Sequence, residues 1–512
     1  MSDIIAKIAD EYDEVPYLSS AFPSSCPEHL QGLGHLFNVP GPDVERARVL
    51  ELGCSMGGNI IPFAARWPQA KVVGLDLSPT QIASGQRIVE AMGLTNIELR
   101  QMNLMDVRPA LGQFDYIICH GVYSWVPADV QDTILRVCSE NLAPEGLAYV
   151  SYNTYPGWKG KEILRDAMML RGGHRATASE RLAYARGMID FLEKWAKPGS
   201  MLATALAGHA ETIRNGSPHY LLHEYLEACN APCYFKDFIA AAGKHGLGYV
   251  AESNAARMVV SHHGAEVERA LLSELKDQID IEQYLDFIQD SAFRTTILAH
   301  KAHMEKVAYA VPAAGFRGCH VAAGRSPGKP NGGEPGISVH NLIVNRILAA
   351  WPSTVPVDEL IDASKREFAA HDPAEIESMV LQSLRMVFLH GALRVRRHPV
   401  VVGANEATHP RVVAGMAELV AISGGGLPQV QLFNAWHEAV SLDVVSQRLI
   451  PRLDGTRDRA ELCAAMVEDA AKGVLRFTRD GVQVTDAVEI EHCVQEHVGN
   501  SLRNLRKLAI LA

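Results

Sequence analysis

The sequence lacks the features of membrane-spanning and exported proteins. No stretch reaches about 18 uninterrupted apolar residues, the length that crosses a bilayer. The first residues carry no basic start, no apolar run and no small-residue cleavage site, so we expect no signal peptide. These absences predict a protein without membrane insertion and with a cytoplasmic location.

Cysteine clusters and excess positive charge are also missing. Of nine cysteines, Cys229 and Cys233 lie close together, but no second pair completes a zinc site. The 48 basic and 59 acidic residues give a net charge of −11, and an acidic surface repels phosphate backbones. We therefore expect reduced structural thiols, no bound metal and no nucleic-acid partner. The acidic balance suits a lysine-rich partner, although solubility explains it as well.

Patterns along the 512 residues divide the chain into four segments. Residues 47–153 alternate apolar runs with helical stretches, which predicts a parallel sheet with crossover helices. Strands are expected at 47–53, 71–76, 97–101, 114–120 and 147–153, and Ser78–Gln81 has the pattern of a capping box. The expected segments are a doubly wound (Rossmann-like) α/β domain with an N-terminal cover (1–160), a helical segment (161–310), a Gly/Pro-rich linker (311–336) and a C-terminal α+β module for which a winged-helix-like fold is considered (337–512).

Two parts of this division allow alternatives. The strand expected at 248–252 and the helix before it can be the last elements of the first domain, with 160–215 as an insertion. Arg394, Arg396 and Arg397 could make a winged-helix contact with DNA. Because the whole chain is acidic, we interpret them as an exposed strand or a protein-binding surface.

A turn rich in small residues follows the first expected strand. Gly53, Ser55 and Gly57 let the backbone turn sharply and pass close to a ligand. Asp76 ends the second expected strand, where a carboxylate can accept hydrogen bonds from both ribose hydroxyls of an adenosine. The pattern therefore predicts an adenosine-containing cofactor.

Two classes of cofactor fit such a turn. A nicotinamide fingerprint has its third glycine five positions after the first, where Gly58 lies, so spacing does not exclude it. Its second glycine, which admits a pyrophosphate, is replaced by Ser55. Glu51 suits a ligand with a free ammonium and no pyrophosphate. The balance favours S-adenosylmethionine and a methyltransferase.

Several segments resemble one subgroup of class I S-adenosylmethionine-dependent methyltransferases. The segments are Val49–Asn59, Val73–Ser78, His120–Pro127 and Ser151–Trp158; the last two are specific, whereas the glycine loop is shared across the superfamily. The resemblance extends to Tyr12–Tyr17, Tyr220–Glu227, Gln283–Phe287 and, more loosely, Leu453–Arg457. The subgroup has a methyltransferase regulatory domain, which would lie within 161–310. It includes the rickettsial lysine methyltransferases that modify outer membrane protein, and the resemblance also implies a homodimer.

The resemblance implies roles for individual residues. Glu51, Gly53, Ser55 and Gly57 would surround the methionine end of the cofactor, Asp76 would hold the ribose, Leu77 would pack on the adenine and His120 would lie on the sulfonium side. Many class I enzymes have an aspartate where this chain has Asn103, whose amide oxygen can accept the same bond. The predicted cofactor-binding set is completed by Tyr17, Asn59 and Leu104.

Aromatic and polar side chains follow the fourth and fifth expected strands, at the edge where ligands bind in open α/β sheets. An aromatic, desolvated slot lowers the pKa of a lysine amine, about 10.4 in water, and stabilises the charge that develops on nitrogen. The predicted catalytic residues are His120, Tyr123, Trp125, Tyr152, Asn153 and Trp158, with Tyr155 nearby and Tyr12 and Tyr17 in a cover. Each aromatic could instead be a core residue.

The sequence thus predicts a methyltransferase that uses S-adenosylmethionine, with protein lysine side chains as favoured acceptors. Two alternatives stay open at this point. One is a small-molecule methyltransferase whose extra domains build a substrate pocket, and the other is a cofactor-binding regulator without catalysis.

Overall fold

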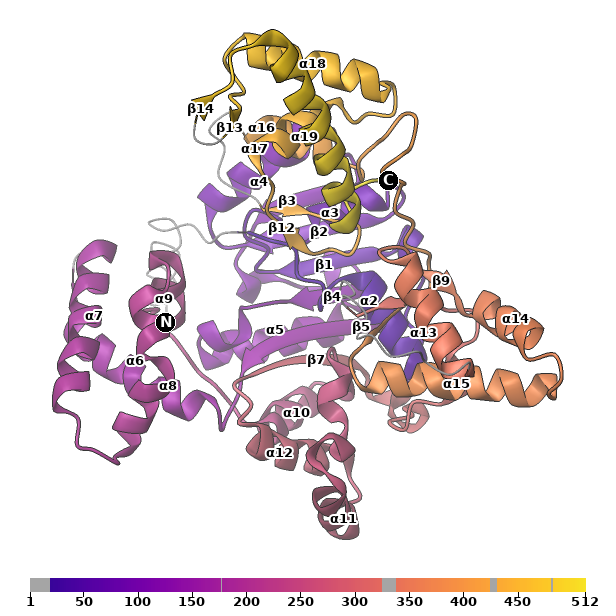
Figure 1. Cartoon of the computed structure of the whole chain (residues 1–512). Helices are drawn as coiled ribbons and strands as arrows, with labels where there is room; N and C mark the ends of the chain where they lie inside the picture. The colour runs from indigo at the N-terminus through magenta and orange to yellow at the C-terminus, as the bar shows by residue number, and fades with distance from the viewer. Residues whose placement is uncertain (1–18, 176, 325–337, 424–430, 480–481) are drawn as a thin grey trace.

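The computed structural model describes residues 19–512 except 176, 325–337, 424–430 and 480–481. The predictions for Tyr12 and Tyr17 lie outside the described residues. A central sheet is surrounded by helices, a group of four helices stands to one side of it, and two C-terminal units cover other faces (Figure 1). Among the described residues, no helix combines the length and the apolar character that a membrane span requires.

The central sheet has seven strands in the order β3-β2-β1-β4-β5-β7-β6. Neighbours among β1 to β5 run parallel, whereas β7 is antiparallel to both β5 and β6. The strands are β1 (Arg48–Leu52), β2 (Lys71–Asp76), β3 (Ile97–Gln101), β4 (Phe114–Cys119), β5 (Leu142–Asn153), β6 (Leu247–Glu252) and β7 (Phe293–His300). The order reverses between β1 and β4, and ligands bind at the carboxyl ends of strands at such a point. The doubly wound fold is confirmed.

Short helices connect the strands and pack on the sheet. They are α2 (Pro27–Leu36), α3 (Ile61–Arg66), α4 (Pro79–Ala91), α5 (Ala128–Glu140) and α10 (Phe235–Lys244). Ser78 caps α4, because its hydroxyl accepts a hydrogen bond from the Gln81 N–H at 3.1 Å. The other half of the expected capping box differs. The Gln81 side chain bonds to Ser55, and the Ser78 N–H donates to Asp76 at 2.9 Å.

Four helices between β5 and β6 form a unit with its own core. They are α6 (Trp158–Gly172), α7 (Ala178–Trp195), α8 (Met201–Asn215) and α9 (Pro218–Tyr225), and Figure 1 shows them beside the sheet. Their buried apolar side chains, such as Leu164, Ile189 and Leu221, form a cluster separate from the main core. This unit is an insertion into the sheet domain.

The sheet does not end at the expected boundary of residue 160. After the insertion the chain forms α10, β6, α11 (Ala265–Glu274), α12 (Gln278–Gln289) and β7, so two strands of the sheet come from residues beyond 240. The alternative division, with the helix and strand before residue 252 in the first domain, agrees with the strand order. The pattern concealed this because β7 was not recognised among helical stretches.

Residues 311–324 are structured and partly buried, which contradicts the expected exposed linker. Val311 and Phe316 are fully buried, and β8 (His320–Ala323) pairs with β9 (Val355–Pro356) and β10 (Leu393–Arg396). Of the glycines that suggested a linker, Gly318 serves a turn instead, with φ +64°. The rest of the expected linker, 325–336, lies outside the described residues.

Two C-terminal units follow. The first packs α13 (Val339–Ala350), α14 (Val357–Glu367) and α15 (Pro373–Leu389) on the three-stranded sheet β10-β8-β9. The second contains α16 (Met416–Ser423), α17 (Val444–Leu449), α18 (Arg459–Ala471) and α19 (Ala487–Lys507). It also has two hairpins, β11–β12 (Leu432–Phe433, Ala439–Val440) and β13–β14 (Thr478–Arg479, Val482–Gln483).

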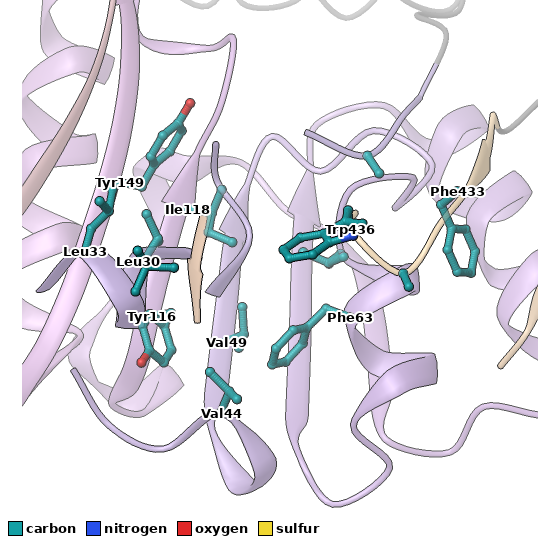
Figure 2. Close-up of a cluster of buried hydrophobic side chains, with 14 of the residues drawn as sticks. Leu30, Leu33, Val44, Val49, Phe63, Tyr116, Ile118, Tyr149, Phe433 and Trp436 are labelled. Atoms are coloured by element: carbon teal, nitrogen blue, oxygen red, sulfur yellow. The ribbon is translucent and has the colours of Figure 1, made fainter. Parts of the chain in front are cut away.

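Both C-terminal units share one hydrophobic core with the central sheet. Figure 2 shows side chains of this core, from Leu30 and Leu33 of α2 to Phe433 and Trp436 of the last unit. The α2 helix also contacts β10 directly. The C-terminal half is therefore packed against the sheet domain rather than attached to it by a tether.

The three arginines near β10 are not an exposed strand or a free protein-binding surface. Arg396 is 5% exposed and lies over the Trp436 ring at 5.2 Å. Arg394 forms an ion pair with Glu438 at 2.5 Å, and Arg397 donates to the Gly318 carbonyl oxygen at 3.2 Å. Arg394 and Arg396 join the two C-terminal units, whereas Arg397 binds next to β8, and charge composition alone does not reveal these contacts.

Candidate functional site

A cavity of about 640 Å³ lies at the carboxyl ends of the parallel strands. It brings together most of the predicted site residues: Glu51, Gly53, Ser55, Asn59, Asp76, Leu77, Asn103, Leu104, His120, Trp125, Asn153 and Trp158. Both the predicted cofactor set and the predicted acceptor set contribute to its walls.

The glycine-rich turn has the backbone that its sequence requires. Gly53, Ser55 and Gly57 have φ values of +76°, +52° and +82°, in the left-handed region that favours glycine. A Cβ atom on Gly53 would lie 2.3 Å from the Val122 side chain. Gly57 is not among the cavity-lining residues, and a Cβ there would press on Ile61 at 3.1 Å. Gly57 therefore shapes the turn, in contrast to its predicted contact with the cofactor.

Asp76 is held at the end of β2 by two backbone donors. Its Oδ2 accepts from the Ser55 N–H at 2.7 Å, and its Oδ1 accepts from the Ser78 N–H at 2.9 Å. These bonds fix the carboxylate plane at the cavity wall. Each carboxylate oxygen has a further lone pair, so the group can still accept hydrogen bonds from a pair of ribose hydroxyls.

Glu51 is a buried carboxyl with one unpaired oxygen. It is 3% exposed, and burial, reinforced by the Asp76 charge, raises its pKa to about 8. The Asn59 amide donates to its Oε1 at 2.7 Å, whereas Oε2 has no partner among the described residues. A buried acceptor without a donor is costly. The amino group of a methionyl moiety would supply that donor, so the residues present fit S-adenosylmethionine.

The other end of the cofactor set is less polar. Leu77 and Leu104 are half-buried cavity residues that offer apolar contacts to an adenine ring. The Asn103 Oδ1 atom accepts from the Met105 N–H at 3.0 Å and caps the short helix η2 (Leu104–Asp106). Its second lone pair remains available. The role of Asn103 toward the adenine amino group stays a prediction.

His120 follows β4 and is a neutral ring at physiological pH. Burial lowers its pKa to about 4. Its Nδ1 lies 3.0 Å from the Tyr149 hydroxyl, and its ring stacks on Phe22 with centroids 3.9 Å apart. Burial raises the pKa of Tyr149, which keeps its proton. His120 therefore presents an uncharged, fixed face to the cavity.

The predicted aromatic slot is only partly formed. Trp125 and Trp158 line the cavity with ring centroids 6.2 Å apart, edge to face. Tyr123 and Tyr152, 5% and 1% exposed, do not line it and are core residues. Both pack on Phe238 of α10, at 5.1 and 4.0 Å. The catalytic roles predicted for Tyr123 and Tyr152 are wrong, because α10 from residue 235 onward covers them.

Asn153 is a buried cavity residue at the end of β5. Its backbone N–H donates to the Ser124 hydroxyl at 2.8 Å, and its side-chain amide donates to Asn230 at 3.2 Å. The first bond ties the loop after β4 to the end of β5. The second ties β5 to the segment after α9. Asn153 thus holds together the parts of the chain that meet at the acceptor side.

Several cavity residues were not predicted from the sequence. They are Ser19, Ser20 and Phe22 before α2, Lys161 on α6, His219, Tyr220, His223 and Glu224 on α9, Phe293 on β7 and Gln431 near the C-terminal unit. The segment Tyr220–Glu227 belongs to the resemblance, but the sequence does not predict that it contributes to the site. The other residues come from regions far from the turn, and no local motif marks them.

The last C-terminal unit reaches the cofactor turn through His437. Its Nε2 lies 3.1 Å from the Asn59 Oδ1, and burial, with the nearby Arg66 charge, lowers the pKa of His437 to about 3. The ring is therefore neutral and can donate to Asn59. The Asn59 amide in turn donates to Glu51. Contacts from His437 to Asn59 and from Asn59 to Glu51 therefore link this unit to the buried carboxyl.

Three family models match different parts of the chain. They are a methyltransferase domain over residues 49–146, a predicted methyltransferase regulatory domain over 217–300 and the PKMT C-terminal winged helix domain over 416–510. The last match confirms the winged-helix expectation for the second C-terminal unit.

Relatives and solved structures resemble nearly the whole chain. The RP789 protein of Rickettsia prowazekii is 30% identical over 503 residues, covering 94% of this chain and 89% of that protein. The RP028 protein of the same organism is 37% identical over 234 residues, covering 46% and 94%. The structure of PKMT2 from Rickettsia typhi covers 97% of this chain and 100% of its own, at 25% identity and a TM-score of 0.84. Its complex with AdoHcy gives 26% and 0.83 with the same coverage.

Proposed function

Because this chain belongs to the same family as the RP789 protein of Rickettsia prowazekii and is an S-adenosylmethionine-dependent methyltransferase, we propose that it methylates lysine side chains of a protein. The single observation that carries the acceptor proposal is the pair Trp125–Trp158. These two rings lie in the same cavity as the cofactor residues Glu51 and Asp76. The PKMT match of the C-terminal unit and the similarity to PKMT2 support a protein acceptor.

The chain's residues would bind the cofactor at three points. Glu51 would accept from its ammonium, Asp76 would accept from its ribose, and Leu77 and Leu104 would pack on its base. When bound, S-adenosylmethionine supplies a methyl group already activated by the positive sulfur. The protein therefore has to align the acceptor nitrogen and keep its lone pair free.

The aromatic part of the cavity suits an amine. Removing an ammonium from water lowers its pKa, so a larger fraction is neutral and able to attack. As the nitrogen gains a bond it gains positive charge, and the faces of indole rings stabilise a nearby cation. The neutral His120 ring does not oppose that charge. In this proposal Trp125 and Trp158 stabilise the charge, while Asn153 holds the loops that carry them.

A protein acceptor is tested by following labelled methyl groups. The enzyme is incubated with labelled S-adenosylmethionine and bacterial lysate, and the products are passed through a desalting column. We expect the label in the protein fraction, and we expect Asp76→Ala to abolish most of the transfer. Label in the small-molecule fraction alone would instead identify a small-molecule methyltransferase.

The proposal also includes a homodimer, which the sequence resemblance implies, and the cytoplasmic location expected from the sequence analysis. Light scattering during size exclusion tests the assembly, and a mass of one chain, 55.8 kDa, would contradict it.

A further inference from the structure

One lysine of the chain already occupies the aromatic part of the cavity. Lys161 lies one turn after Trp158 on α6, and its Nζ atom is 5.1 Å from the centroid of the Trp158 ring. The same Nζ is 2.8 Å from a carboxylate oxygen of Glu224 on α9. Both Lys161 and Glu224 line the cavity, and their side chains are 19% and 21% exposed.

We propose that Glu224 is the carboxylate that first receives the acceptor as an ammonium, before the amine loses its proton and attacks, and that Lys161 is an internal counter-ion which the acceptor displaces. This inference rests on the proposed function, since it names the group that selects a cationic acceptor. The sequence does not predict this role for Glu224, because α9 lies far along the chain from both aromatic loops.

Electrostatics explains why such a site would carry its own lysine. A carboxylate in a partly enclosed cavity that tryptophan rings also line is poorly solvated and costs free energy when unpaired. Lys161 removes that cost before the acceptor arrives. An acceptor lysine offers the same charge and the same contact with an indole face, so one ammonium can replace another at little net cost.

The position of the pair favours exchange over a fixed structural bond. Each side chain is about one-fifth exposed, so both can move toward solvent without unfolding a helix. The Lys161 ammonium sits on a long flexible stem, which allows it to swing away from Glu224. By contrast, the ion pairs of Arg294 with Glu282 and Asp286 are buried on both sides and have no such freedom.

A second ion pair of the same kind provides an internal control. Lys159 Nζ lies 3.7 Å from the centroid of the Tyr155 ring and 3.4 Å from a Glu162 oxygen. This set combines a ring just before α6 with a lysine and a carboxylate on α6. None of its three residues lines the cavity. Substitutions there test the effect of losing a surface ion pair alone.

The test measures the affinity of n-butylammonium, which reproduces the end of a lysine side chain. NMR titration of the AdoHcy-loaded protein gives its Kd for the wild type, Glu224→Gln and Lys161→Met. We expect Glu224→Gln to weaken binding at least tenfold, because the acceptor loses its anionic partner. We expect Lys161→Met to tighten binding several-fold, because the competing internal cation is removed. The controls Lys159→Met and Glu162→Gln should leave the Kd unchanged.

Opposite signs for the two variants distinguish an acceptor site from a structural bond. A salt bridge that merely fastens α6 to α9 would make both variants change the Kd in the same direction and lower the melting temperature alike. That outcome, or no binding to either the wild type or Lys161→Met, would overturn the inference. If Glu224→Gln does not fold, Lys161→Met decides alone. The identity of the methylated product tests the proposed function separately, so the two failures are distinguishable.

Discussion

At the scale of single residues, Glu51 is expected to lose a proton when the cofactor binds. Its carboxyl is buried, and its pKa is raised to about 8. One oxygen accepts from Asn59, and the other has no partner among the described residues. A bound ammonium would favour the ionised form, because an opposite charge at contact lowers the pKa of a carboxyl.

This arrangement makes cofactor binding release a proton. At pH 7, below the raised pKa, most molecules of the free enzyme hold a protonated Glu51. The ammonium-bound form would be ionised, so close to one proton is expected to leave as binding occurs. Calorimetry in buffers of different ionisation enthalpy measures this number. Release should fade as the pH rises above about 8, and Glu51→Gln should abolish it. Equal release by wild type and variant would contradict the role of Glu51.

Asp76 should account for much of the cofactor affinity. Losing charge-assisted hydrogen bonds to a ligand costs roughly 1.5–3 kcal/mol, so Asp76→Ala is expected to weaken AdoHcy binding by about that amount. The exposed Glu98 on β3, which pairs with Arg100, provides the control Glu98→Ala. Calorimetry compares the two folded variants. Unchanged affinity in Asp76→Ala would rule out ribose binding by this carboxylate.

Single residues also show what local sequence patterns can predict and what they cannot. The turn at Gly53 and Ser55, together with Asp76, could be predicted because short-range backbone constraints fix both the geometry and the residue types. Tyr123 and Tyr152 could not be told from cavity residues, since burial selects aromatics as strongly as ligand binding does. Both are core residues because Phe238 of α10, more than 80 residues later, packs on them.

At the scale of elements, the hairpin β11–β12 connects the second C-terminal unit to the cofactor turn. His437 lies between its strands with φ +61°, and its ring contacts Asn59 beside the cofactor turn. The Trp436 indole N–H next to it donates to the Pro352 carbonyl oxygen at 2.8 Å, which anchors the hairpin to the first C-terminal unit. The winged-helix unit thus supports the amide that orients Glu51.

Breaking this contact should weaken cofactor binding from a distance. His437→Asn keeps a residue type that tolerates left-handed backbone but is too short to reach Asn59. We expect AdoHcy affinity to fall by about 1 kcal/mol, the net value of a typical hydrogen bond, with little change in melting temperature. His437→Gln, which can still donate, should restore most of it. If the two variants bind AdoHcy equally, the hairpin has no positioning role.

Elements were predictable where period and order are local. Four of the five parallel strands were expected within one residue of their ends, and β5 begins five residues before its expected start. The long insertion α6–α9 concealed β7 as part of the same sheet, since nothing within a window of residues indicates a return to it, whereas the sequence offered β6 there as an alternative. The glycines near Gly318 suggested a linker, although Gly318 itself serves a turn before the buried strand β8.

At the scale of the whole molecule, the main core passes from the sheet into both C-terminal units, whereas the insertion has a core of its own. Removing residues after 310 would uncover part of this core, for example where α2 packs against β10. Exposure of a large apolar side chain costs roughly 1.5–3 kcal/mol, and a domain has only about 5–15 kcal/mol of stability.

The fragment 1–310 is therefore expected to be insoluble or unfolded. The matched deletion removes the insertion, residues 158–229, and joins its ends with a short glycine linker. Those ends lie close together, because Thr154 and Cys233 form a β-bridge. We expect the deletion variant to keep a cooperative thermal transition. A stable, cofactor-binding fragment 1–310 would contradict the single shared core.

The central claim is that the methyl group passes to lysine nitrogen. Amino-acid analysis of protein labelled by the wild-type enzyme tests it most directly. We expect hydrolysis of the labelled protein to yield N-methyllysine, and we expect the label to survive mild alkali. The initial rate at subsaturating acceptor should rise with pH, because the amine loses its proton. Label recovered as methylarginine, or released as methanol from a methyl ester, would contradict it.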